Sequence, residues 1–367
     1  MPKLEEKIAL SLIPQVGPRL VRRMVSYAGS VEAVFGHEKY WKQKVPGIGR
    51  MKAANFQKEE LINAAFREME YMRKEGISAL FYLDEDYPRR LRECEDAPII
   101  LYTRGNVDLN APKILSIVGT RSATEYGRSI TEKIISELAR SHPDLLIVSG
   151  LAYGIDIAAH KAALKHNLKT IAALGHGLQF MYPSMHRRIA DSIMHQGALV
   201  TEFQGSKKPD PGNFVSRNRI IAGLADATLI IESAEKGGAL ITADLANSYN
   251  REVFAVPGKS TDHYSQGCNN LIKLNKAALV ETGADIELAM GWINLDKKKI
   301  LIQKQLFEEL SPEEKRIVEF LNTNGESYLD EISSFLEISV GKVSATLLNL
   351  EFRGWVRALP GKQFQTV

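Results

Sequence analysis

The sequence predicts an α/β protein built around a doubly wound parallel sheet, and three observations lead to this prediction. Short apolar runs alternate with stretches of helical periodicity in the middle of the chain, which is the pattern of parallel strands joined by crossover helices. Four of these runs end in glycine, as expected where a parallel strand passes into a ligand-facing loop. The length of 367 residues is too great for one core of ordinary size, so additional domains are expected.

Charge and cysteine content limit the binding partners and the cellular compartment that are expected for this protein. Residues 1–75 carry a net charge of +5 and residues 301–367 a net charge of −3, so a nucleic-acid partner is expected at the front and middle of the chain. The two cysteines, Cys94 and Cys268, fit neither a disulfide framework nor a cysteine metal site. Together with a charged N-terminus and no long apolar run, they predict a cytoplasmic protein with no membrane segment.

Residues 1–75 are predicted to form a helical domain of the helix-hairpin-helix or SAM-like type. Apolar residues recur at helical spacing, and glycine-containing hairpins interrupt them at residues 13–19 and 45–50. The second hairpin reads Val-Pro-Gly-Ile-Gly-Arg, whose exposed glycine amides suit a DNA phosphate, whereas the first has Gln15 in place of a glycine. The alternative is a helical bundle with tight turns and no DNA contact.

Residues 76–290 are predicted to form the central, Rossmann-like domain. Residues 76–82 and 99–102 read as strands that lead into it. Six further apolar runs are the predicted parallel strands, namely 114–119, 145–150, 170–175, 198–203, 227–233 and 253–258.

Residues 291–310 are predicted to be a linker, and residues 311–367 a winged helix. Ser311 to Glu314 is a strong helix start, residues 329–336 and 340–352 have helical periodicity, and the strand-like segments around Pro360-Gly361 predict a two-stranded wing. Because the third helix carries only Lys342 and Arg353 as cations, we expect protein contact or packing here rather than DNA binding.

The turn after the first predicted parallel strand contains Gly119, Thr120 and Arg121. A strand, a tight turn and a helix bring free backbone amides and the positive end of a helix to one place. Glycine permits close approach of a ligand, and arginine adds a two-pronged donor for phosphate. The alternative is an ordinary turn with a surface arginine.

The second turn, Ser149 to Asp156, is predicted to be another anion-binding turn. Ser149 and Gly150 begin it, and Gly154 opens the following helix. Asp156 and His160 share a helix face, where they form either an acid–base pair or, as we favour, a hydrogen bond that fixes the turn. No metal site is expected, because no other ligand group has matching spacing.

Two further glycine turns follow. Gly175-His176-Gly177 lacks the third glycine and the acidic residue of a dinucleotide fingerprint, so no nicotinamide or flavin cofactor is expected. Gly237 and Gly238 open a later helix. Neither a nucleophile elbow nor a Walker lysine is found, which favours a binding surface over an active site.

The segment from residue 207 to 219 carries the strongest sign of nucleic-acid binding. It combines cations with an aromatic residue in a loop rich in proline and glycine, and this combination is typical of proteins that hold single-stranded nucleic acid without reading its sequence. The predicted contact residues are Lys207, Lys208, Phe214, Arg217, Asn218 and Arg219. The alternative is that the ring fills the core and the arginines pair with carboxylates.

Several of these motifs occur in the order that is typical of the DNA-processing protein A family, also called DprA or Smf, and the chain resembles that family over about residues 80–285. The motifs are VGTR (118–121), SGLAYGID (149–156), TIAALGHG (170–177), FVSRNRIIAGL (214–224), GGALITA (237–243) and SQGCNNLI (265–272). The family often has a lysine where Pro211 stands, for which Lys207 or Lys208 would substitute, and a serine where Gly238 stands.

The resemblance implies a dimeric single-stranded DNA-binding protein of natural transformation that protects DNA, loads the RecA recombinase and is not an enzyme. It implies phosphate contacts at residues 119–121, a base on Phe214, and Arg217 and Arg219 along the strand. One alternative is a phosphoribohydrolase-like enzyme on nucleotides, with Asp156 and His160 as catalysts. Another is a protein adaptor that uses the winged helix.

Overall fold

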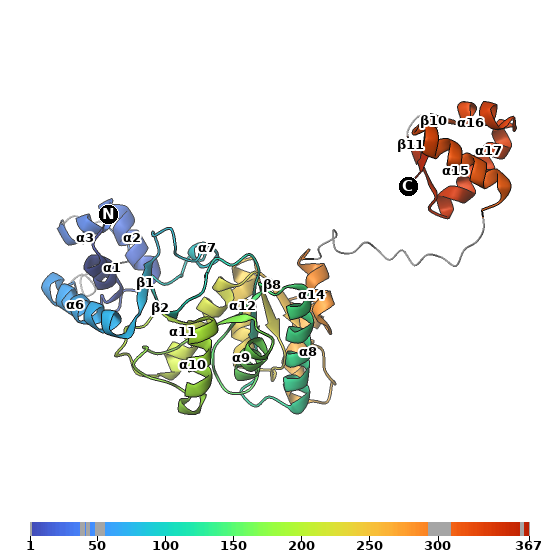
Figure 1. Cartoon of the computed structure of the whole chain (residues 1–367). Helices are drawn as coiled ribbons and strands as arrows, with labels where there is room; N and C mark the ends of the chain where they lie inside the picture. Colours follow the sequence, from blue (N-terminus) through green and yellow to red (C-terminus); the bar gives the residue numbers. More distant parts are fainter. Residues whose placement is uncertain are drawn as a thin grey trace. The chain divides into compact units, whose positions relative to one another are not determined.

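The computed structural model describes residues 2–36, 41, 45–47, 56–292, 310–359 and 363–366. Its internal contacts divide the chain into two units, residues 1–293 and 294–367, and each unit is described here by itself (Figure 1). In the described part, no helix has the length and apolar character needed to cross a membrane.

The first unit is organised around a mixed nine-stranded sheet with the order β1-β2-β6-β5-β4-β3-β7-β8-β9. Its strands are β1 (Ser78–Phe81), β2 (Ile100–Gly105), β3 (Ile114–Val118), β4 (Leu146–Ser149), β5 (Lys169–Ala173), β6 (Ala198–Thr201), β7 (Ala227–Ile230), β8 (Glu252–Ala255) and β9 (Ala278–Leu279). The strands from β6 to β9 pair in parallel, and β1 and β2 extend the sheet as antiparallel strands. The predicted doubly wound α/β fold is confirmed.

The chain reverses its direction of winding between β3 and β7. It moves outward from β3 through β4 and β5 to β6, and then returns to place β7 on the other side of β3. Ligands of open α/β sheets bind beyond the carboxyl ends of the strands at such a reversal. The turns after β3 and β7 therefore meet where a binding site is expected.

Helices cover both faces of the sheet. They are α6 (Lys58–Glu75), α7 (Arg89–Arg92), α8 (Glu125–Ser141), α9 (Ile155–Lys165), η1 (Ser184–His186), α10 (Arg187–Gln196), α11 (Pro211–Leu224), α12 (Gly238–Ser248), η2 (His263–Ser265), α13 (Gln266–Lys273) and α14 (Gly283–Ala289). The side chains of β3 point alternately into the two cores on either face of the sheet. Leu115 and Ile117 belong to the core under α8, α9 and α14. Ile114 and Val118 belong to the core under α11, α12 and α13. A strand that is buried on both faces explains its unbroken apolar run.

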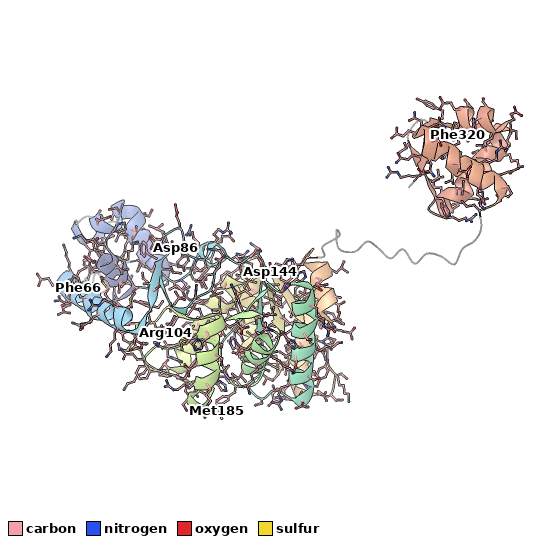
Figure 2. The ribbon with its side chains drawn as sticks, in the orientation of Figure 1. Phe66, Asp86, Arg104, Asp144, Met185 and Phe320 are labelled. Atoms are coloured by element: carbon pink, nitrogen blue, oxygen red, sulfur yellow. The ribbon has the colours of Figure 1, made fainter. Side chains whose placement is uncertain are left out.

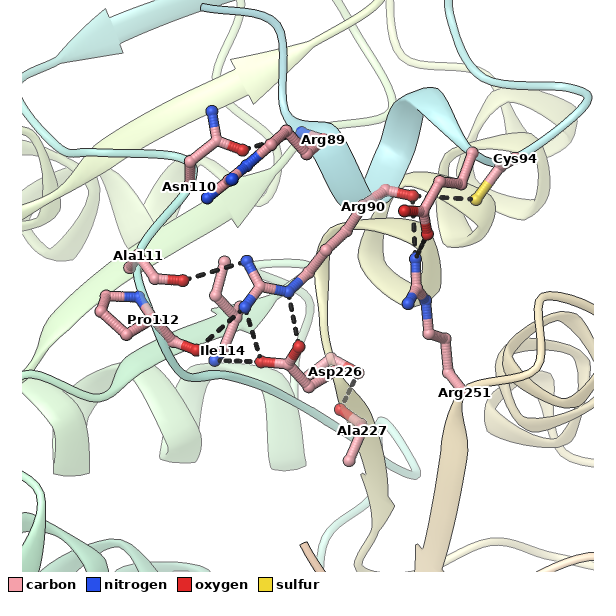
Figure 3. Close-up of polar contacts among 12 residues, drawn as sticks. Arg89, Arg90, Cys94, Asn110, Ala111, Pro112, Ile114, Asp226, Ala227 and Arg251 are labelled. Atoms are coloured by element: carbon pink, nitrogen blue, oxygen red, sulfur yellow. Dashed lines mark hydrogen bonds and ion pairs between the residues drawn. The ribbon is translucent and has the colours of Figure 1, made fainter. Parts of the chain in front are cut away.

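A half-buried arginine holds the amino ends of β3 and β7 together. Arg90 on α7 pairs with Asp226 at 2.6 Å and donates to the carbonyl groups of Ala111 and Pro112 at 3.0 Å (Figure 3). The Asp226 carboxylate also accepts a hydrogen bond of 2.8 Å from the amide of Ile114. These contacts fix the register of the two strands that flank the reversal.

The N-terminal part of the first unit is helical, as expected. Helices α1 (Leu4–Ser11), α2 (Pro18–Ala28) and α3 (Val31–Gly36) precede α6. In the first hairpin, Gln15 adopts the left-handed conformation with a φ of 60°, which a glycine would adopt at lower cost. Residues 48–50 of the second hairpin lie outside the described residues, so the phosphate contact predicted there stays a prediction.

The second unit has the predicted winged-helix elements around its own apolar core. They are α15 (Pro312–Asn324), β10 (Ser327–Tyr328), α16 (Leu329–Leu336), α17 (Val340–Phe352), β11 (Val356–Leu359) and β12 (Gln363–Thr366). Ser311 caps α15, because its hydroxyl accepts from the amide of Glu314 and the Glu314 carboxylate accepts from the amide of Ser311. Most of the predicted linker and the turn of the wing lie outside the described residues.

Candidate nucleic-acid interface

A cavity of about 540 Å³ opens at the carboxyl edge of the sheet, where the winding reverses. The turns after β3 and β7 and the first residues of α11 and α12 form its walls. Eight predicted contact residues line it: Gly119, Thr120, Arg121, Phe214, Arg217, Asn218, Gly237 and Gly238. The volume lies in the range that is typical of ligand pockets.

The turn after β3 differs from the predicted phosphate-binding turn. The buried carboxylate of Glu232, which follows β7, accepts hydrogen bonds from the amide and the hydroxyl group of Thr124, the cap residue of α8. The Thr124 hydroxyl also accepts from the amide of Gly127 at 3.1 Å. The positive end of α8 therefore already holds a carboxylate of the chain itself, and the phosphate contact predicted at this turn stays a prediction.

Two glycines near this turn allow close packing of α9. A Cβ atom at Gly119 would lie 2.5 Å from Ile155, the first residue of α9. Gly154 has a φ of +76°, and a Cβ atom there would lie 2.1 Å from the carbonyl oxygen of Thr120. Both glycines allow the start of α9 to pack directly on the first turn. Gly119 also lines the cavity, so the ligand approach predicted there stays a prediction.

Arg121 remains available after these contacts are counted. Its side chain is exposed, and within the described residues no carboxylate pairs with it. The guanidinium carbon lies 5.9 Å from the centre of the Phe214 ring. Arg121 thus contributes an uncompensated positive charge at the mouth of the cavity.

Arg217 holds the second turn in place. Its side chain binds the protein itself, which corrects the prediction that it lies along a bound DNA strand. Arg217 is 4% exposed, and its guanidinium group donates to the carbonyl groups of Gly150 (2.6 Å) and Ala173. A Cβ atom at Gly150 would lie 2.3 Å from this guanidinium group, so residue 150 is glycine because the arginine occupies that space. Burial lowers the pKa of Arg217 to about 10, so it stays charged at neutral pH.

Ser149 and His160 also serve the interior, whereas the buried Asp156 is part of the cavity wall. The Ser149 hydroxyl donates to the carbonyl of Ile117 at 2.6 Å. Asp156 accepts a long hydrogen bond (3.4 Å) from the amide of Ala152, and burial raises its pKa, whereas the charge of Arg217 lowers it. Asp156 fixes the turn as expected, but it does so without His160.

His160 packs away from Asp156. Its Nδ1 atom lies 2.8 Å from the hydroxyl of Thr170 on β5, and its side chain is fully buried. Burial and the nearby charge of Arg217 lower the pKa of His160 to about 3, so the ring is neutral at pH 7. His160 is not among the residues that line the cavity, so the predicted pairing with Asp156 is wrong.

Arg219 is likewise turned toward the protein. Its guanidinium group forms an ion pair with Glu202 and donates to the carbonyl of Asp96. Both partners lie in the first unit, and the arginine side chain is 11% exposed. The prediction that Arg219 lies along a bound strand is therefore corrected to a structural role for its side chain.

An aromatic pair forms one side of the cavity. The half-buried ring of Phe214 lies 5.3 Å from the ring of Tyr182, with 39° between the two planes. Gly175 leaves room for Phe214, since a Cβ atom there would lie 2.6 Å from its ring. His176 accepts from the amide of Tyr182 at Nε2 (3.3 Å), so the Gly-His-Gly motif positions this pair.

The start of α12 forms the opposite side. Gly237 is its cap residue and offers no side-chain acceptor, and within the described part the amides of Gly238 and Ala239 form no hydrogen bond. A Cβ atom at Gly238 would meet no atom within 4 Å. This helix end, unlike that of α8, is open toward the cavity and favours an anion.

Further cations stand near this edge. Lys207 and Lys208 are exposed and belong to no ion pair of the described residues, and the same holds for Lys236, which precedes Gly237. The lysines at 207 and 208 do not line the cavity itself. A bound nucleic-acid strand would have to extend beyond the cavity in order to reach these lysines.

Sequence reasoning missed three residues of the site. Tyr182 and Tyr153 are exposed aromatic residues that line a smaller recess beside Arg121, and Glu232 fills the end of α8. Aromatic residues in the loops that follow the strand-end glycines Gly150 and Gly175 were an available signal for the tyrosines. For Glu232 there was none, because its partner lies 108 positions away.

Comparison with known proteins agrees with this arrangement. The family described as DNA recombination-mediator protein A matches residues 78–290, and the DprA winged helix domain matches residues 304–362. The protein Smf of Synechocystis is 33% identical over 98% of this chain and 97% of its own length. The DNA processing protein DprA of Streptococcus pneumoniae is 42% identical over 56% of this chain and 71% of its own length.

Solved structures give the same result. The DNA processing protein A of Streptococcus pneumoniae matches with a TM-score of 0.66 and 32% identity, covering 79% of this chain and 98% of that one. The DNA processing protein A of Helicobacter pylori, solved in a study of its single-stranded DNA binding mode, matches with a TM-score of 0.53 and 29% identity over 59% of this chain and 96% of that one. With its sheet, its winged helix and its motifs all accounted for, the chain belongs to the DNA recombination-mediator protein A family, also known as DprA or Smf.

Proposed function

We propose that this chain is a non-catalytic protein that binds single-stranded DNA along the carboxyl edge of its sheet, independently of DNA sequence. One observation carries the proposal: the ring of Phe214 lines the same cavity as the unpaired Arg121 and the open start of α12. A ring that stacks a base next to groups that bind phosphate is the usual arrangement for holding unpaired DNA.

The chemistry of the available groups supports binding independent of sequence. Arg121 and the amides of α12 suit phosphate oxygens, which every nucleotide carries. The faces of Phe214 and Tyr182 suit any base, because every base has a π-face. Arg217 and Arg219 support the site from within, since their guanidinium groups are bound to the protein.

The proposed contact residues are therefore fewer than the sequence suggested. Seven predicted contact residues line the cavity and are retained, namely Gly119, Thr120, Arg121, Phe214, Asn218, Gly237 and Gly238. Lys207 and Lys208 are retained as phosphate contacts farther along the strand. The Helicobacter pylori relative, which was solved in a study of its single-stranded DNA binding mode, supports single-stranded DNA as the ligand.

We infer a role in natural transformation in which a homodimer protects incoming DNA and loads the RecA recombinase on it. The family description as a recombination mediator supports this role. RecA assembly on DNA that is covered by a single-strand-binding protein tests it. Addition of this chain should shorten the lag of RecA assembly, and an unchanged lag would contradict the mediator role.

Direct titration tests the DNA-binding proposal. Labelled oligonucleotides of thymidine, adenosine or cytidine should bind with similar affinity, and a duplex of the same length should bind more weakly. Affinity should fall as salt rises, because binding to phosphates releases counterions. Salt-insensitive binding, or a preference for duplex, would contradict the proposal. Release of free base from purine nucleotides would instead indicate the phosphoribohydrolase-like alternative.

A further inference from the structure

Helix α17 of the second unit presents an apolar face to solvent. Leu348 and Phe352 lie four residues apart on one side of this helix and are 51% and 82% exposed. Gly341 and Ala345 continue the same side toward the start of the helix and are also exposed. Trp355 follows the helix and is 45% exposed. A run of exposed apolar residues on one helix side indicates a contact surface.

This face is poorly suited to DNA, although the equivalent helix of many DNA-binding proteins enters the major groove. The only two cations of α17 and its cap are held by α15. Lys342 pairs with Glu313 at 2.5 Å, and Arg353 pairs with Glu314 at 2.8 Å. A face that displays side chains such as Phe352 would place apolar surface against phosphate, so a protein surface is the better partner.

The pattern along α17 is complementary to itself. Small residues, Gly341 and Ala345, occupy one end of the face, and the large ring of Phe352 occupies the other. Ala345 and Phe352 are separated by two helical turns, and Leu348 lies near the midpoint between them. When two copies of the helix lie antiparallel, Leu348 meets its own copy and each Phe352 lies over Ala345 and Gly341 of the other helix. This is the geometry of a two-fold interface.

We propose that α17 is a self-association surface through which the winged-helix units of two copies of this chain pair in antiparallel orientation. Small residues at the contact allow the helices to approach closely, and the exposed rings supply the apolar area. The pairing buries no unpaired cation of α17 or its cap, because Lys342 and Arg353 are already bound to Glu313 and Glu314.

The expected strength of this contact follows from its size. An aromatic side chain buries at most about 150–250 Å², whereas stable interfaces bury about 1,200–2,000 Å² in total. The pairing is therefore weak between separate molecules. If two chains are also joined through their first units, the second units are held at a high effective concentration and pair readily.

A single cysteine at the two-fold axis tests the proposal in the full chain. Leu348→Cys should give a covalent dimer with a short bis-maleimide, because each thiol faces its own copy. The native Cys94 and Cys268 are buried, and burial raises the pKa of their thiols to about 11 and about 12, so the unsubstituted chain should react little. Glu326→Cys, in the exposed loop between α15 and β10, is the matched control and should remain monomeric in the gel.

A second substitution connects the cross-link to the proposed geometry. Adding Phe352→Ser to the Leu348→Cys chain should reduce the cross-linked fraction about tenfold, since a lost buried ring weakens association by at least 1.4 kcal/mol. The largely exposed Phe352 is not needed for folding of the unit. The proposal is overturned if Leu348→Cys gives no dimer, if Glu326→Cys gives an equal amount, or if Phe352→Ser leaves the fraction unchanged.

Discussion

Replacement of Arg121 by alanine gives the most direct test of the proposed DNA site. Arg121 is exposed and has no carboxylate partner among the described residues, so its removal breaks no ion pair of the protein. A charge-assisted hydrogen bond to phosphate contributes about 1.5–3 kcal/mol, which corresponds to an increase of about 10- to 150-fold in the dissociation constant. The loss of one phosphate contact should also reduce the slope of log affinity against log salt by about 0.7.

Fluorescence anisotropy with a labelled thymidine oligonucleotide at several salt concentrations measures both quantities. Arg140→Ala is the matched control, because it removes the same charge from the far end of α8, where Arg140 contacts Ser136. The control should change affinity by less than about twofold, as expected for a distant, screened charge. Equal losses in the two variants would show that overall charge, rather than a specific contact of Arg121, drives binding, and this result would refute the reasoning.

Three further predictions concern stacking, packing and pH. Phe214→Ala should weaken binding of every homopolymer by about 1–3 kcal/mol, and a loss confined to one base in anisotropy titrations would contradict the stacking role. Gly150→Ala places a Cβ atom 2.3 Å from Arg217 and should lower the free energy of unfolding by about 1–3 kcal/mol. Gly238→Ala, with no atom within 4 Å, is its control and should not destabilise the fold in the same urea titration. The pKa of His160 is about 3 in the folded state and near 6.5 in the unfolded chain, so its contribution to stability is complete above pH 6.5 and is lost as the pH falls toward 3. His160→Asn should therefore lose less stability than the unsubstituted chain between pH 7.5 and pH 5, and an identical pH dependence would contradict the assignment.

Much of the fold could be predicted because its signals are local. The apolar run of β3 is continuous because both faces of the strand are buried. The helix start at Ser311 depends on a contact with Glu314, which is only three residues away. The order of the strands could not be predicted, because the pairing of β3 with β7 joins residues more than 100 positions apart. Joining β1 and β2 to the edge of the sheet likewise depends on contacts that no local pattern reports.

The site was predicted less completely, for a related reason. Glycine turns and an aromatic residue marked the edge of the sheet at which the cavity opens, but the direction of an arginine side chain depends on its helix face. Arg217 lies three, four and seven residues before the buried Ile220, Ile221 and Leu224, so helical spacing already placed it on the inner face of α11. A count of cations without their helical phase therefore did not separate the arginines that bind the protein itself from the exposed Arg121.

The carboxylate of Glu232 at the end of α8 has a consequence for competing ligands. In many nucleotide-binding α/β proteins the first strand-to-helix turn anchors the phosphates of a single small molecule. Here that anchor is already taken by the chain itself, so a free nucleotide loses its main point of attachment. A long polymer, which makes many weak contacts along the rim, does not depend on that one anchor. Millimolar nucleoside triphosphates should accordingly displace little bound DNA.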